Sequence, residues 1–171
     1  MVGNIVGQVL FAVFPLAMAF AAISDLFTMT ISNRLTLGLA VAFVALSLVV
    51  GMDLHTFGLH WAAGGAVFAV AFTCFALGWV GGGDAKLASV TALWLGWVGT
   101  IEYIALASIF GGALTLLVLT FRRQVLPAFV VRQPWIRRLH DQRAGVPYGV
   151  ALAAAGLAVY PHTVWMHMAI G

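Results

Sequence analysis

The stretch Leu59–Val80, LHWAAGGAVFAVAFTCFALGWV, contains no Lys, Arg, Asp or Glu. At about 1.5 Å of rise per helical residue, a run of this length covers a hydrocarbon core of about 30 Å. The whole chain has the same character, because 63% of its residues are hydrophobic, 8% are charged and the mean hydropathy is +1.07. Soluble domains carry about 25% charged residues. The composition therefore predicts an integral membrane protein.

Further apolar runs lie on both sides of this stretch. The strands of a membrane barrel would alternate apolar and polar residues, and these runs do not, so they predict transmembrane helices. We expect an all-α, polytopic membrane bundle of about six crossings, formed as a single domain by residues 1–171. The runs are Ile5–Ser24, Leu35–Gly51, Leu59–Val80, Ala88–Val98, Ile101–Phe121 and Tyr148–Met168.

The basic side chains fall in alternate connections between these runs. Arg34 follows the first run, Lys86 follows the third, and the remaining basic residues lie between the fifth and the sixth. Those remaining residues are Arg122, Arg123, Arg132, Arg137, Arg138 and Arg143. Because cytoplasmic loops are enriched in Lys and Arg, we expect these connections in the cytoplasm and both termini outside. A re-entrant hairpin at the short run Ala88–Val98 would break the alternation, so we expect this run to cross as well.

Several kinds of site have no support in the sequence. The net charge of +3 follows from basic cytoplasmic connections beside anionic lipid, and it does not indicate nucleic acid. Cys74 is the one cysteine, so no intramolecular disulfide and no cysteine-built zinc site is expected. His162 and His167 are separated by about 140° round a helix, which does not suit a metal-binding pair. We expect the histidines at the outer interface of the membrane instead.

Two aspartates at the cytoplasmic ends of apolar runs are candidate functional residues, because an ionisable group in a membrane segment is costly. Asp84 follows Gly81–Gly83, and its simplest role is to cap the helix that begins there. Asp25 lies where a helix C-terminus disfavours negative charge, and its simplest role is to pair with Arg34. Two close carboxylates that share a proton can instead activate water and polarise a peptide carbonyl. The glycines would then admit an extended substrate backbone, although they also suit close helix packing.

Three motifs occur together in the order expected for a known protein family. They are Gly81-x-Gly83-Asp84-x-Lys86-Leu87, Ser24-Asp25-Leu26 followed by Ile31-Ser32-Asn33, and Val146-Pro147-Tyr148-Gly149. Over nearly the whole chain the sequence resembles the bacterial prepilin peptidases, or type IV leader peptidases, which are intramembrane aspartyl proteases. The resemblance implies that Asp25 and Asp84 are catalytic and that no metal or other cofactor takes part. It further suggests that Gly81, Gly83, Lys86 and Asn33 shape the site or bind substrate.

The same resemblance implies a substrate and a location. Prepilin peptidases remove short basic leaders from pilin or pseudopilin precursors at the cytoplasmic face of the bacterial inner membrane. Their work serves pilus biogenesis and protein secretion, so a pilus assembly machinery is a further expected partner. The family usually has Ile-Pro-Asn where this chain has Ile31-Ser32-Asn33. Larger members carry an amino-terminal cysteine-rich domain associated with methylation, which this sequence lacks, so it resembles the compact form found with Flp/Tad-type pili.

Two other functions use the same aspartates differently. A small membrane carrier or assembly subunit would use Asp25 and Asp84 for proton relay or for ion pairs with Arg34 and Lys86. A carrier more often places ionisable groups near the bilayer midplane and shows two related halves, and neither feature is evident here. A protease that cuts complete transmembrane segments, as presenilin-like enzymes do, is a closer alternative. The identity of the substrate would separate it from a leader peptidase.

Overall fold

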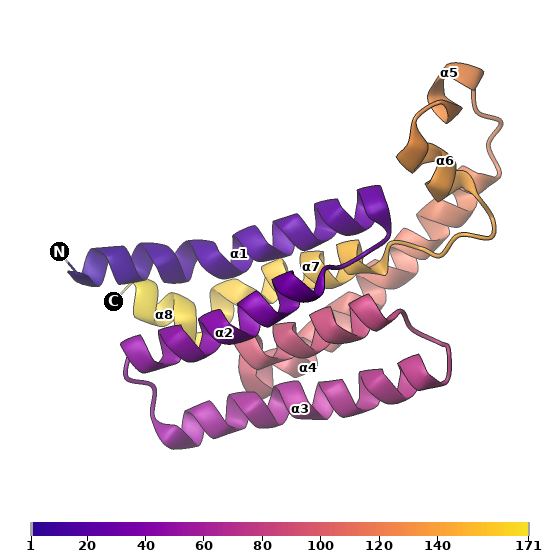
Figure 1. Ribbon diagram of the computed structural model, residues 1–171. Helices are drawn as coiled ribbons and strands as arrows, with labels where there is room; N and C mark the ends of the chain where they lie inside the picture. Colours follow the sequence, from indigo (N-terminus) through magenta and orange to yellow (C-terminus); the bar gives the residue numbers. More distant parts are fainter. Residues whose placement is uncertain (1, 171) are drawn as a thin grey trace.

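Helices make up every regular element in the computed structural model, which describes residues 2–170 (Figure 1). In chain order they are α1 Val2–Thr28, α2 Asn33–Val49, α3 Leu54–Ala76, α4 Gly82–Arg122, α5 Ala128–Val131, α6 Pro134–His140, α7 Tyr148–Val159, the 3-10 turn η1 Tyr160–His162, and α8 Val164–Ile170. Helices α1, α3 and α4 are long and apolar enough to cross a membrane, and α2 is a shorter apolar helix. The predicted all-α membrane bundle is confirmed.

Helix α4 contains both runs that the sequence predicts as separate helices, Ala88–Val98 and Ile101–Phe121. Its backbone is not helical at Gly96, where φ is 70° and ψ is −175°, so α4 consists of two helices joined at a sharp bend. The second half returns to the end of the bundle where the first half begins (Figure 1). Glycine reaches this backbone region without steric penalty, which other residues do not. The bend takes the place of a loop between the two helices, and Glu102 lies within the second of them.

The kink of α4 also explains a histidine that sequence reasoning places wrongly. We expected His60 at the outer interface, but its side chain is buried in the bundle. Its Nδ1 lies 2.7 Å from the carbonyl oxygen of Leu93, close before the kink. A Cβ built on Gly96 would lie 3.0 Å from the imidazole ring. The missing side chain at Gly96 thus provides the room in which His60 packs.

The last apolar run, predicted as one helix over Tyr148–Met168, is divided into α7, η1 and α8. Pro161 lies in η1 and cannot donate a backbone hydrogen bond, so an α-helix does not continue through it. The interruption lets Trp165 of α8 turn into the core, where its Nε1 donates to the carbonyl of Trp94 at 2.8 Å. Phe14 and Tyr160 stack beside these indoles. This aromatic cluster fixes α1, α4 and α8 against one another.

One end of the bundle collects the elements that carry the candidate residues. Helices α1 and α3 end there, α2, α4 and α7 begin there, and α5 and α6 extend beyond it (Figure 1). Helix α7 packs between α1 and α4. Because of this arrangement, the ends of three helices far apart in the sequence meet at one place.

Candidate active site

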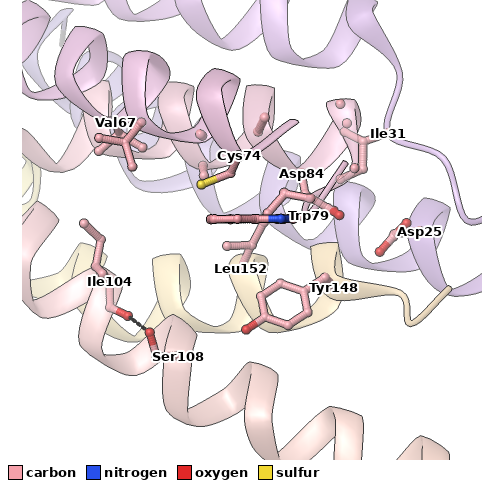
Figure 2. A pocket seen from close by; sticks show the side chains of 18 of the residues that line it. Asp25, Ile31, Val67, Cys74, Trp79, Asp84, Ile104, Ser108, Tyr148 and Leu152 are labelled. Atoms are coloured by element: carbon pink, nitrogen blue, oxygen red, sulfur yellow. Dashed lines mark hydrogen bonds between the residues drawn. The ribbon is translucent and has the colours of Figure 1, made fainter. Parts of the chain in front are cut away.

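A cavity of about 1270 Å³ lies among α1, α3, α4 and α7. Its end near α5 and α6 is polar and includes Asp25, Asp84 and the glycines Gly81–Gly83. The remainder is mostly apolar and continues between α3 and the second half of α4. Figure 2 shows this polarity, with Asp25 and Asp84 at one end and Val67 and Ile104 at the other.

Asp25 lies in the last turn of α1 and is buried, with 5% of its surface exposed. The backbone N–H of Gly149 donates to its Oδ2 at 2.7 Å, and the N–H of Val150 also bonds to the carboxylate. Both N–H groups belong to the first turn of α7, where backbone donors have no partner within the helix and the helix dipole favours an anion. The first turn of α7 therefore stabilises the negative charge of Asp25, which the C-terminal end of α1 disfavours.

The simple roles predicted for the two aspartates do not describe this geometry. Among the described residues no ion pair joins Asp25 to Arg34, whose side chain is exposed. Helix α4 begins earlier than expected, with Gly81 as the N-cap and Asp84 in the first turn. A Cβ on Gly81 would lie 2.9 Å from Asp84 Oδ2, so the carboxylate reaches back over the glycine. The glycine run permits this early start because it leaves that space free.

Asp25 and Asp84 lie at the same end of the cavity, as Figure 2 shows. They are close enough for the charge of Asp25 to act electrostatically on Asp84. Ile31 packs close by, because a Cβ on Gly83 would lie 3.2 Å from Ile31 Cβ and a Cβ on Gly149 would lie 2.7 Å from Ile31 Cδ1. These two glycines let α4 and α7 approach the connection after α1. Two carboxyl groups in such a setting can exchange a proton with a water molecule between them.

The remaining predicted site residues divide into two groups. Gly81 and Gly83 line the cavity beside Asp84. Lys86 and Asn33 instead line a separate hollow between α2, α3 and α4. The Nζ of Lys86 donates to Oδ1 of Asn33 at 2.8 Å. Residues two apart on a helix point in nearly opposite directions, about 200° round the axis, so Asp84 and Lys86 serve different faces of α4.

Gly149 is the residue of this site that sequence reasoning did not select. The segment Val146-Pro147-Tyr148-Gly149 carried part of the family resemblance, but no role followed from it. A Pro directly before an apolar run is a signal for a helix start, and a helix start is a place where anions bind. That signal identifies the donor, but nothing in the local sequence identifies Asp25, at a distance of 124 positions, as the acceptor.

The histidines provide no metal centre in the described part of the chain. No group of three or more His, Cys, Asp or Glu side chains there could hold a metal ion. His162 lies 4.0 Å from Glu102 in an exposed pair at the other end of the bundle. The side chain of His167 lies outside the described residues.

Comparison with protein families gives a match that covers more than half of the chain. Residues 12–116, which include both aspartates, match the type IV leader peptidase family. No curated protein and no solved structure matches the chain.

Proposed function

The chain belongs to the type IV leader peptidase family, and from this premise we propose that it is an aspartic endopeptidase in which Asp25 and Asp84 act as a pair. The observation that carries the proposal is the meeting of the two carboxylates at the polar end of one cavity. Each comes from a different helix, and neither is neutralised by an ion pair among the described residues. A purely structural role would favour such a neutralising partner.

The pair would hydrolyse a peptide bond through a single water molecule. One aspartate is ionised and takes a proton from the water as the water oxygen attacks the carbonyl carbon. The other aspartate is protonated and donates its proton to the carbonyl oxygen. The C–N bond then breaks, and the leaving amine receives a proton from the pair. Because interacting carboxyl groups titrate as a unit, these roles belong to the pair and not to either residue alone.

The substrate we propose is the short basic leader of a type IV prepilin or pseudopilin of the Flp/Tad kind. The scissile bond would lie at the polar end of the cavity, and the apolar remainder suits an apolar segment of the substrate beyond it. The chain would act in the bacterial inner membrane, with residues 1–171 forming one membrane-embedded domain. The basic connections adjoin the aspartate end, which supports an active site at the cytoplasmic face and termini outside.

Replacement of each aspartate tests the proposal. Asp25→Asn and Asp84→Asn should each abolish leader removal, because either change leaves one carboxylate without its partner. Co-expression with a candidate prepilin, followed by a gel shift, measures the cleavage. Asp53→Asn is the matched control, since Asp53 only caps α3 through Thr56 N–H at 2.9 Å and Asn caps equally well. Cleavage near the wild-type level in either active-site variant would exclude the pair.

A further inference from the structure

Arg122, the last residue of α4, is buried with 9% of its surface exposed. Its Nε donates to the carbonyl of Leu139 at 2.8 Å, and its Nη2 donates to the carbonyls of Ala144 at 3.0 Å and Gly145 at 2.8 Å. A buried guanidinium is costly unless its donors are satisfied. The acceptors are backbone carbonyls at the end of α6, for Leu139, and in the connection that returns from α6 to α7, for Ala144 and Gly145. Arg122 therefore holds that connection in one conformation.

The connection held by Arg122 leads directly into the candidate site. Gly145 and Val146 line the cavity, Pro147 is buried, and α7 begins at Tyr148. Gly149, whose N–H binds Asp25, is only four positions beyond the Gly145 carbonyl that Arg122 holds. Proline fixes its own φ and restricts the backbone of the residue before it. A displacement of Gly145 would therefore also displace the start of α7.

A second set of contacts ties α6, from which this connection leaves, to α1. Arg138 of α6 donates from Nη1 to the carbonyl of Phe27 at 2.8 Å, and the rings of Trp135 and Phe27 lie 5.3 Å apart. Phe27 follows Asp25 by two residues on α1. Helix α6 therefore contacts the helix that carries Asp25, and the connection after α6 leads to the helix start that binds the Asp25 carboxylate.

We propose that Arg122 is a positioning residue for the reaction. By holding the carbonyls of Leu139, Ala144 and Gly145, it sets the start of α7 so that the N–H groups there direct Asp25 toward Asp84. The fit at the other end of this link is tight, because a Cβ on Gly149 would lie 2.8 Å from Asp25 Oδ2. A shift of about 1 Å in a reacting group costs about 100-fold in rate. The inference rests on the proposed function, since its readout is peptide cleavage.

Arg122→Gln, compared with Arg123→Gln, is the first test. The neighbouring Arg123 is exposed, so the control removes the same charge without removing the contacts to the connection. With purified protein and a leader peptide, we expect kcat to fall roughly ten- to hundredfold in Arg122→Gln, while KM changes less than about threefold. Arg123→Gln should keep both constants. Arg122→Lys should fall between them, because an ammonium cannot reproduce the planar set of donors. A wild-type kcat in Arg122→Gln would overturn the proposal.

A double-mutant cycle with Gly149→Ala separates positioning from a general loss of stability. If both residues act through the start of α7, the double variant should lose clearly less activity than the product of the two single losses. Losses that multiply would mean that the two residues act independently, and would also overturn the proposal. Gly58→Ala is the control for the added methyl group, since no atom lies within 4 Å of its Cβ.

Two further results need separate interpretation: an Arg122→Gln variant that does not fold, and aspartate variants that remain active. If thermal unfolding in detergent shows that Arg122→Gln is not folded, the cycle is run with Arg122→Lys, and the same two outcomes decide it. The activity of the aspartate variants distinguishes a failure of the proposed role of Arg122 from a failure of the proposed function. Inactive Asp25→Asn and Asp84→Asn beside a fully active Arg122→Gln would remove only the role of Arg122. Active aspartate variants would instead remove the proposed function itself.

Discussion

At the scale of single residues, Asp25 shows how two helix ends combine. Its own helix presents carbonyl groups and an unfavourable dipole at this position, whereas the first turn of α7 presents N–H groups and a favourable one. The hydrogen bond from Gly149 N–H at 2.7 Å means that the position of α7 determines the orientation of the Asp25 carboxylate. A residue that would be costly in an isolated helix is thereby held in the bundle interior.

Gly111 and Gly112 provide a matched pair of substitutions for the placement of Tyr148. A Cβ on Gly111 would overlap the ring of Tyr148, whereas a Cβ on Gly112 would meet nothing within 4 Å. Tyr148 is the first residue of α7 and its side chain lines the cavity with Asp25 and Asp84, so a displaced ring changes the shape of the candidate site. We expect Gly111→Ala to lower kcat/KM for a leader peptide by about tenfold or more, and Gly112→Ala to leave it unchanged. Equal activity of the two variants would show that this packing does not affect the site.

Local sequence identifies some of these residues and not others, for a physical reason. Asp25 and Asp84 are conspicuous because a charge beside long apolar runs is visible without any knowledge of the fold. The direction of the Lys86 side chain depends on its position round the axis of α4. In the structure this side chain binds Asn33 in the separate hollow and does not line the cavity of the aspartates. The contacts of Asp25 with Gly149 and of Arg122 with Gly145 join residues far apart in the chain. Such pairs follow only from the packing of the helices.

At the scale of elements, the bend in α4 shows how far hydropathy predicts the fold. Hydropathy locates both apolar runs as separate helices, but it does not show that one non-helical residue, Gly96, joins them in place of a loop. The decisive information is the backbone of Gly96 and the ring of His60 that packs against it. The first half of α4 carries Asp84 and the second half lines the apolar part of the cavity. The bend therefore sets the angle between the two parts of the candidate site.

Gly96→Ala tests whether this bend depends on glycine. The φ of 70° with ψ of −175° is accessible essentially to glycine alone, and other residues there cost about 1–3 kcal/mol. The added methyl would also press on His60. We expect the free energy of unfolding, measured by denaturant titration in detergent, to fall by about 1–3 kcal/mol. Gly65→Ala on α3, where a Cβ meets nothing within 4 Å, should not destabilise the protein. An unchanged stability of Gly96→Ala would mean that the bend does not depend on glycine at this position.

At the scale of the whole molecule, the charges and the aspartates share one end of the bundle. Arg34 and Lys86 lie near the starts of α2 and α4, and Arg122 is the last residue of α4. Figure 1 shows these helix ends at the same end of the bundle as the end of α1, which carries Asp25. The opposite end carries Asp53, where α3 begins. This polarity is what the alternation of basic connections predicts from sequence alone. On this rule, the end with the basic residues and the aspartates would face the cytoplasm, and the end with Asp53 would face outside.

Reporter fusions test that direction. A fusion in the connection near Arg132 should report the cytoplasm, and a fusion near His55 should report the outside, because Lys and Arg retain their loops on the cytoplasmic side. An alkaline phosphatase and a fluorescent protein, each active on one side only, provide opposite signals at the same position. The reverse pattern would place the aspartates on the outer face, away from a leader exposed to the cytosol.

The contact between α1 and α7 also bears on how the protein is made. Asp25 emerges early in translation, Asp84 follows, and the N–H group that holds Asp25 belongs to Gly149. A nascent chain that has released only its first helices from the ribosome carries both acids but lacks the element that orients one of them. On the proposed function, the chain acquires proteolytic competence only after α7 has entered the membrane. Its half-made forms, inserted among other newly synthesised proteins, are therefore harmless to them.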